Sequence, residues 1–361
     1  MVMRDDCVRR SNSAPFVVEA EKPMPKIKPA LVLGSGFHRF VLGDTTSYRH
    51  RTPLVSWSAL LDQVAEQLEV PVPAQSLTSP MRWEEILLSR SRHDQKTPPS
   101  KAEQDARKAV ATIMSGAAKD YPDNERSRIP KDPVWGAVVS LNFDMAWMQA
   151  AEAIELTVLS LQGDDYLSRI KPPIERSRLS MSVPVMTDEE AVSSRVWFPN
   201  GAYFRPATLR MGLRDYGFKA AALDKAFGII KGWERRGTQR HDSPSEKFEA
   251  VCRLLESKET IDQSPPLTWV THFLYRPLVF LGVGLSPDEQ GLWWLLSQRA
   301  RNTRLVNRTD RAKAHILLRS DDERRSMWEQ RPFGLEPYFC TSWQYGWEEM
   351  MEKVETETEH D

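Results

Sequence analysis

Two glycines, Gly34 and Gly36, follow a short apolar run in the segment "LVLGSGFH". Glycine lets the backbone come close to a bound group, and amide N–H groups at the start of a helix favour an anion such as a diphosphate. The dinucleotide fingerprint G-x-G-x-x-G requires a third glycine where this sequence has Arg39. A plain strand-to-helix turn therefore explains the segment as well as a diphosphate-binding turn does.

The segment "SLNFD" places two polar side chains, Asn142 and Asp144, after another apolar run. An Asn side chain offers one acceptor and two donor hydrogens, which suits a ribose hydroxyl or an attacking water. Asp144 is able to accept from a hydroxyl group or to cap the helix that follows, and the cap is the more ordinary use.

A third segment, "GVGLSPDEQG", combines Gly282, Ser286 and Asp288. Ser286 followed by proline and acidic residues is typical of a helix start. The same residues suit a ribose or adenine contact just before that helix, and the two interpretations are compatible.

The segment "VWFPNGAYFRP" contains the pair Asn200-Gly201. Asn-Gly is the favoured pair of a type I′ hairpin turn, so a corner between two strands is the simplest interpretation. The alternative is that Asn200 occupies a position in a reaction site.

Composition limits the class of protein. The 361 residues include 49 basic and 50 acidic side chains, so the formal charge of −1 gives no overall attraction to nucleic acid or to a membrane. The three cysteines stand far apart and the seven histidines show no paired spacing, which disfavours a zinc site and a disulfide framework. No stretch approaches the ~18 apolar residues of a membrane span, and the N-terminus lacks the apolar core of a signal peptide. We expect a cytoplasmic protein without a metal.

Strands that end in glycine or polar turns, each followed by a helix, predict an α/β fold with a Rossmann-like doubly wound parallel sheet. The clearest strands are 30–33, 137–141 and 278–281, and "KAHILLR" and "LEPYFC" predict two more. Ligands of such sheets bind at the carboxyl ends of the strands, where all the segments above lie. We expect an N-terminal tail over 1–25, one domain over 26–345 with helical insertions near 75–130 and 210–260, and an acidic C-terminal tail over 346–361.

In this order, the segments resemble the sirtuin-like NAD-consuming domains of bacterial antiphage defence proteins. Those domains read G-A-G-x-S, a Trp-Leu-Leu helix, T-N-Y/F-D, a His-Gly pair and G-Y-S-L-S-D, and the resemblance spans roughly residues 29–345. It implies an NAD-binding sheet with helical insertions and cleavage of the nicotinamide–ribose bond by water. The zinc module of the protein deacylases needs two CxxC pairs, which this chain does not have, so deacylation is disfavoured.

The resemblance also assigns roles to individual residues. It implies that Asn142 positions the ribose and the attacking water, that Asn200 stands where the family has its His, and that the glycine pairs and the last motif bind NAD as the substrate. The cofactor-binding set is Gly34, Ser35, Gly36, Phe37, His38, Asp144, Gly201, Gly282, Ser286 and Asp288.

Asn200 is the main departure from the family. An amide has no useful pKa, so it holds a hydrogen bond but takes no proton, and general acid–base help is worth ~10²–10⁴-fold in rate. Three explanations stay open: a pseudoenzyme that binds a nucleotide, a reaction that runs through Asn142 and orientation alone, or a deliberate replacement of the His.

We therefore expect an NAD⁺ hydrolase effector subunit of an antiphage system, gated by a separately encoded sensor that responds to a nucleotide or to nucleic acid, by a small nucleotide signal, or by self-association. Direct binding of this chain to nucleic acid is not indicated. The main alternative is a catalytically inactive nucleotide-binding or scaffold subunit. An ordinary Rossmann dehydrogenase is disfavoured because the third fingerprint glycine is missing.

Overall fold

The computed structural model describes residues 27–42, 56–93, 98–119, 135–144, 182–186, 192–236, 243–256, 268–287, 289–306 and 313–359. The expected N-terminal tail, the helix expected after Asp144, and Asp288 lie outside the described residues.

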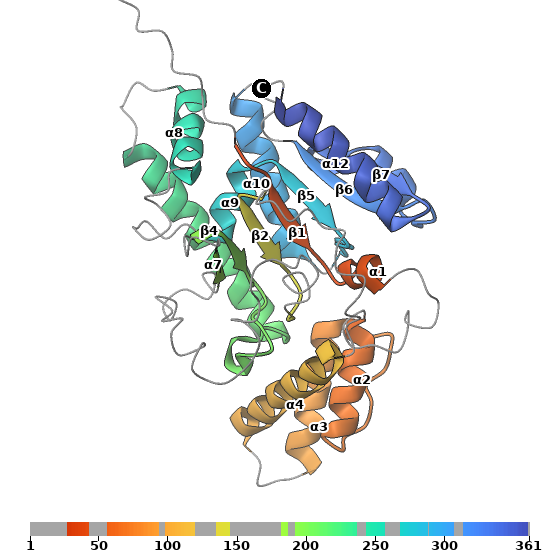
Figure 1. The fold of residues 1–361 in the computed structure, drawn as a ribbon. Coiled ribbons are helices and arrows are strands. Elements are labelled where there is room, and N and C mark those ends of the chain that lie inside the picture. The colour runs from red at the N-terminus through yellow and green to blue at the C-terminus, as the bar shows by residue number, and fades with distance from the viewer. Residues whose placement is uncertain are drawn as a thin grey trace, which may run out of the picture.

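The centre of the molecule is a seven-stranded sheet in the order β3-β4-β2-β1-β5-β6-β7 (Figure 1). Six strands are parallel, and β3 runs antiparallel to β4 at one edge. Numbered along the chain, the six parallel strands lie in the order 3-2-1-4-5-6, which is that of a doubly wound Rossmann sheet. The predicted fold class is confirmed. The strands are β1 Ala30–Leu33, β2 Ala137–Ser140, β3 Ser182–Met186, β4 Val192–Trp197, β5 Leu278–Leu281, β6 Ala314–Arg319 and β7 Leu335–Cys340.

The apolar run of β1 is continuous because both of its faces are covered. Leu31 and Leu33 point into one hydrophobic cluster, whereas Ala30 and Val32 point into the other. Successive side chains of a strand alternate between the faces of a sheet, so a central parallel strand must be apolar throughout.

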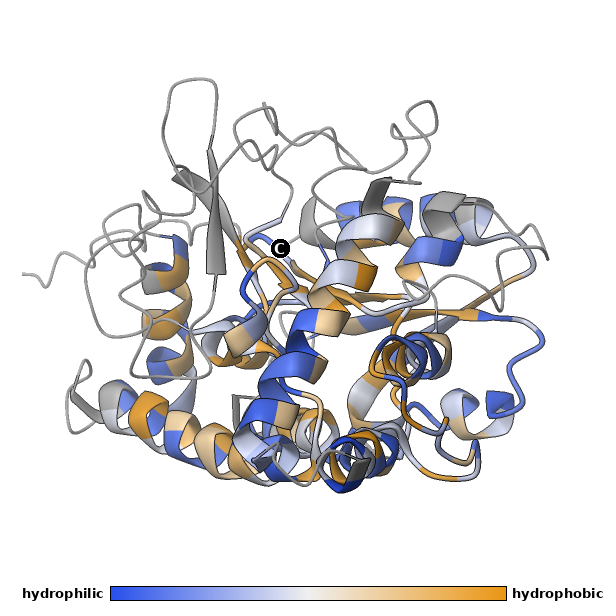
Figure 2. Ribbon diagram, turned by 90° about the horizontal axis from the view of Figure 1, so that it is seen from below, coloured by the Kyte–Doolittle hydropathy of each residue, from blue (hydrophilic) through white to orange (hydrophobic). Residues whose placement is uncertain are grey.

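Helices form a layer on each side of the sheet. The cluster on one face includes residues of α1 Phe37–Leu42, α2 Trp57–Gln67, α3 Ser79–His93, α4 Pro99–Lys119 and α12 Trp343–Glu359. The cluster on the other face includes residues of α7 Leu213–Arg236, α8 Pro244–Glu256, α9 Trp269–Tyr275, α10 Gln290–Val306 and α11 Arg325–Glu329. Figure 2 shows apolar strands in the middle, surrounded by helices that carry both hydrophobic and hydrophilic residues.

The helices α2, α3 and α4 form a group of their own, beyond the carboxyl ends of β1 and β2, toward which the arrowheads of these strands point (Figure 1). Helix α2 begins after Ser56, whose Oγ accepts a hydrogen bond from the Ala59 amide at 3.3 Å. Its buried stripe includes Leu60, Leu61 and Val64, which is the spacing that the sequence predicts for a helix with one apolar face.

The C-terminal segment differs from the tail expected over 346–361. Helix α12 runs through this segment as far as Glu359. Its Trp347, Met350, Met351 and Val354 are buried and belong to the same hydrophobic cluster as Leu31. The acidic side chains lie between these apolar positions, so a segment with an acidic composition still has an apolar stripe at helical spacing. Among the described residues, no helix has the length and apolar content needed to cross a bilayer.

Candidate functional site

The two glycine turns at the ends of β1 and β5 are in direct backbone contact. The Gly36 amide donates to the Gly282 carbonyl at 2.9 Å, and Gly282 has a φ of +66°. A Cβ atom on Gly34 would lie 2.4 Å from the Gly282 carbonyl oxygen, and one on Gly282 would lie 2.0 Å from the Phe37 amide nitrogen. The strands β1 and β5 flank the point where the strand order reverses, which is where doubly wound sheets bind their ligands. These glycines are therefore required for the contact between the two turns.

The same contact limits what the first turn offers to an anion. The amides of Gly34, Gly36, Phe37 and His38 all donate to backbone carbonyls. Among the described residues, no backbone carbonyl accepts from the amide of Ser35. The Phe37 ring is fully buried and packs in the hydrophobic core.

Asn142 follows β2 and reaches the turn after β1. Its Nδ2 donates to the Gly34 carbonyl at 3.0 Å, and the residue is 7% exposed. Within the described part of the chain, Oδ1 of Asn142 accepts no protein donor, which leaves it to a hydroxyl group or a water. This arrangement fits the predicted role of positioning a ribose.

His38 and Asp144 form a buried pair between the same two turns. Nε2 of His38 lies 3.0 Å from Oδ2 of Asp144. The predicted alternatives for Asp144 were a hydroxyl acceptor and a helix cap, and the structure adds His38 as its partner. Tyr203 is close enough for the Asp144 charge to act on it: burial, helped by that charge, raises the pKa of Tyr203 to about 12. Its phenol therefore keeps its proton at neutral pH.

Asn200 lies at the end of β4 and is not the corner of a hairpin. The chain continues from it through the short helix η1 (Pro206–Thr208) into α7, and the antiparallel partner of β4 is the preceding strand β3. Nδ2 of Asn200 donates to the Leu141 carbonyl at 2.8 Å, and Nζ of Lys219 donates to its Oδ1 at 2.8 Å. Because a carbonyl only accepts and an ammonium only donates, these two partners fix which way the amide points.

Gly201 is required by the backbone at this turn. Its φ is +84°, and a Cβ atom there would lie 2.2 Å from the Thr208 carbonyl oxygen. The hairpin interpretation is thus wrong about the path of the chain, although a glycine is needed here for the same conformational reason.

Lys219 is a site residue that the sequence analysis missed. Burial lowers the pKa of Lys219 to about 8, and the charge of Glu289 partly opposes this effect. The lysine is in the second turn of α7 and Glu289 immediately precedes α10, so Lys219 lies between the ends of β4 and β5. Nothing in the local sequence distinguishes it from a surface lysine of a helix.

Ser286 and its neighbours are fixed by a second set of contacts. The Ser286 amide donates to Oε2 of Glu289 at 3.1 Å, and its carbonyl accepts from Trp293 Nε1 at 3.0 Å. Arg324 donates to the carbonyls of Gly284 and Leu285. The expected helix start at Ser286 is wrong: α10 begins at Gln290, and the Glu289 carboxylate accepts from the Ser286 amide in the turn before the helix.

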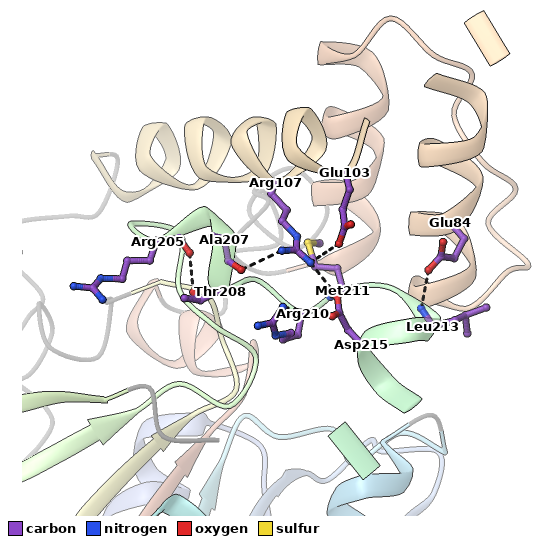
Figure 3. Close-up of polar contacts among 10 residues, drawn as sticks. All are labelled: Glu84, Glu103, Arg107, Arg205, Ala207, Thr208, Arg210, Met211, Leu213 and Asp215. Atoms are coloured by element: carbon purple, nitrogen blue, oxygen red, sulfur yellow. Dashed lines mark hydrogen bonds and ion pairs between the residues drawn. The ribbon is translucent and has the colours of Figure 1, made fainter. Parts of the chain in front are cut away.

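Contacts from α4 hold the segment between Asn200 and Lys219 (Figure 3). Arg107 donates to the Ala207 carbonyl at 3.0 Å and pairs with Asp215, which also accepts from the Met211 amide at 3.2 Å. Glu84 of α3 accepts from the Leu213 amide at 3.0 Å. The predicted helical insertion therefore contacts the chain that carries two of the site residues.

The assembled site offers amide groups, one His–Asp pair and one lysine of lowered pKa, which suit hydrogen bonding and proton transfer. In the described ranges, no three His, Cys, Asp or Glu side chains gather as a metal ion would require. No protein-family model matches the sequence, and no curated protein matches it either. The sirtuin-like resemblance rests on the short motifs and their order, and it stays a prediction.

Proposed function

We propose that this protein is an NAD⁺ hydrolase that cleaves the nicotinamide–ribose bond. One arrangement supports the proposal most directly. At the carboxyl ends of four parallel strands, Asn142 binds the Gly34 carbonyl and Gly34 lies against Gly282. Asn200 binds the carbonyl of Leu141, the residue before Asn142. Doubly wound sheets bind dinucleotides at this edge, and these are the positions to which the resemblance assigns catalysis.

In the proposed reaction, each polar group has a definite task. Oδ1 of Asn142 orients a ribose hydroxyl or the attacking water, and the Ser35 amide contributes a donor for the diphosphate. The oxygen of water bonds to C1′ of the ribose and one proton of that water passes to a base or to solvent, while the C1′–N bond breaks and nicotinamide leaves with the bonding electron pair. The amide of Asn200 has no useful pKa and takes no proton, so the role of Asn200 is limited to orienting its neighbours through hydrogen bonds.

The direct test is nicotinamide release from NAD⁺ by three forms: the unaltered protein, Asn200→His, and Asn142→Ala with Asn200→His. Each form is assayed alone and with the proteins encoded beside it in the genome. We expect release that rises in Asn200→His and is lost when Asn142 is also removed. The absence of release from all three folded forms, with the neighbouring proteins present, would contradict the proposal.

A second candidate is a catalytically inactive nucleotide-binding subunit. The observation in its favour is that the amide of Asn200, in the position of the family His, is hydrogen-bonded at both ends within the protein. Calorimetric binding of NAD⁺ without turnover, in every form above, would favour this candidate.

The biological setting follows from the resemblance alone. We place the protein in a bacterial antiphage system, in which NAD⁺ depletion would halt the infected cell, with a separately encoded sensor as its activator. The insertions near 75–130 and 210–260 are the proposed partner surfaces. Coexpression with the neighbouring genes, followed by affinity purification, tests whether a complex forms.

A further inference from the structure

Lys219 occupies a fixed position beside the residue that replaces the family His. Its Nζ donates to Oδ1 of Asn200 at 2.8 Å, and Nδ2 of Asn200 donates to the Leu141 carbonyl. The start of α7 is held by Asp215, which accepts from the Met211 amide, and by Glu84, which accepts from the Leu213 amide. The lysine is therefore placed by the protein rather than by a ligand.

Its surroundings favour the neutral amine. The residue is half-buried with its ammonium end directed toward the buried Asn200, and burial lowers the pKa of Lys219 to about 8. A group with a pKa near the working pH is effective in proton transfer, because both of its protonation states are well populated. An ordinary lysine, with a pKa of about 10.4, would be almost entirely protonated at neutral pH.

The charged neighbours of Lys219 come from few elements. Glu289, before α10, favours the ammonium, and the Tyr216 ring lies 6.0 Å from Nζ on the same helix. Other charged contacts of α7 lie toward its two ends. Near the start, Asp215 pairs with Arg107 and Arg210, and Glu84 of α3 binds the Leu213 amide. Near the end, Glu234 pairs with Lys231 and binds Tyr275 of α9. The pKa of Lys219 is therefore set mainly by two effects: desolvation lowers it, and the charge of Glu289 raises it.

We propose that Lys219 is the general base of this site and that Asn200 is the residue that positions it. The inference rests on the proposed NAD⁺ hydrolysis. The neutral amine of Lys219 removes one proton from the water as its oxygen bonds to C1′, while the C1′–N bond breaks and nicotinamide leaves. The products are ADP-ribose, nicotinamide and the Lys219 ammonium, which returns its proton to solvent. The pair Asn200–Lys219 thus provides the proton acceptor that the amide of Asn200 alone lacks, and the His of Asn200→His would be a faster base in the same place.

The experiment measures nicotinamide release between pH 6 and pH 9.5 for the unaltered protein, Lys219→Met and Lys219→Arg, with the neighbouring proteins present. For the unaltered protein, we expect the rate of nicotinamide release to rise about tenfold per pH unit below about pH 8 and to become constant above it. Lys219→Met should release nicotinamide roughly 10²–10⁴-fold more slowly, and its rate should no longer rise with pH. Lys219→Arg keeps a donor for Asn200 but stays protonated, so it should be as slow as Lys219→Met.

Two outcomes separate this inference from the proposed function. If the unaltered protein releases nicotinamide and Lys219→Arg matches its rate and pH profile, Lys219 has only a positional role and the inference fails alone. If the unaltered protein releases none at any pH, the proposed hydrolysis fails and the base role fails with it. Lys28→Met, which changes an exposed lysine outside the site and outside the proposed partner surfaces, is the control and should keep the full rate. Circular dichroism checks that each variant is folded.

Discussion

Nε2 of His38 lies 3.0 Å from Oδ2 of Asp144, and the side chains of both residues are buried. The two residues are 106 positions apart, and their pair joins the start of α1, just after the turn that follows β1, to the turn after β2. The Asn142 contact with the Gly34 carbonyl joins the same two turns. The site is therefore held together by its own polar groups before any substrate binds.

A double-mutant cycle measures the strength of this pair. With His38→Ala, Asp144→Ala and the double variant, we expect a coupling of about 1–3 kcal/mol in the free energy of unfolding, because hydrogen bonds to charged groups are among the strong ones. The exposed pair Arg325–Glu329, at spacing i,i+4, is the control and should couple by less than about 0.5 kcal/mol. Equal couplings for the two pairs would contradict the structural role of His38 and Asp144.

Gly282→Ala should destabilise the protein, because the residue combines a φ of +66° with a Cβ position 2.0 Å from the Phe37 amide. Left-handed backbone strain in a non-glycine residue costs about 1–3 kcal/mol, and the clash adds to it. Gly284→Ala is the matched control, since nothing lies within 4 Å of its Cβ position. Urea unfolding should show a large loss for the first variant and less than about 0.5 kcal/mol for the second.

Arg107→Ala tests the connection between α4 and the segment after β4 (Figure 3). The change removes the donor to the Ala207 carbonyl and the partner of the buried Asp215, so we expect a loss of about 1–3 kcal/mol in unfolding free energy. Lys101→Ala, on the same helix, removes only a surface pair with Asp105 and should cost about 0.5 kcal/mol or less. A cost for Arg107→Ala no greater than that for Lys101→Ala would show that the connection carries little energy.

Trp347→Ala tests the packing of α12 on the sheet. Trp347 is 2% exposed and lies in the hydrophobic cluster, so truncation should cost about 3–5 kcal/mol. Tyr345→Ala, two residues earlier and 69% exposed, should stay within about 0.5 kcal/mol of the unaltered protein. Thermal unfolding of the two variants side by side makes the comparison, and equal effects would count against a packed helix.

The lowered pKa of Lys219 predicts a pH dependence of stability. Below about pH 8, Lys219 is protonated in both the folded and the unfolded state, and the folded state carries the full cost of the buried charge. Between about pH 8 and pH 10.5, only the unfolded state keeps the proton, so stability rises with pH. Relative to Lys219→Met, the unaltered protein should gain roughly 3 kcal/mol over this range. A difference that stays constant with pH would show that the pKa is not lowered.

The central strands were predictable because each is short and apolar, with a glycine after β1 and β5 and a polar turn after β2. The predicted ranges for β1 and β5 agree with the structure residue by residue, and that for β2 is one residue longer than the strand. The order of the strands did not follow from any single segment, because pairing in a parallel sheet is set by long crossovers. Helix α12 was missed because acidic composition outweighed an apolar stripe that starts at Trp347.

The site was predictable only in part. Glycine and Asn residues that follow apolar runs pointed correctly to one edge of the sheet, since the carboxyl ends of parallel strands share an edge. The partners of these residues depend on three-dimensional geometry: Lys219 reaches Asn200 only through the path of η1 and α7, and His38 meets Asp144 across two turns. The course of the chain through η1 and α7 cannot be predicted from the motifs of a single sequence.

The strand order also has a consequence for how the chain acquires its structure. Strand β1, near the N-terminus, has β2 and β5 as neighbours, and its Ala30 pairs with Leu278. A nascent chain cannot complete the middle of this sheet until residue 281 has left the ribosome, so one edge of β1 stays unpaired until then. High contact order slows folding, and exposed apolar strands promote aggregation in the meantime. Yield of this protein in the cell should accordingly respond to translation speed and to chaperones that hold unfinished chains.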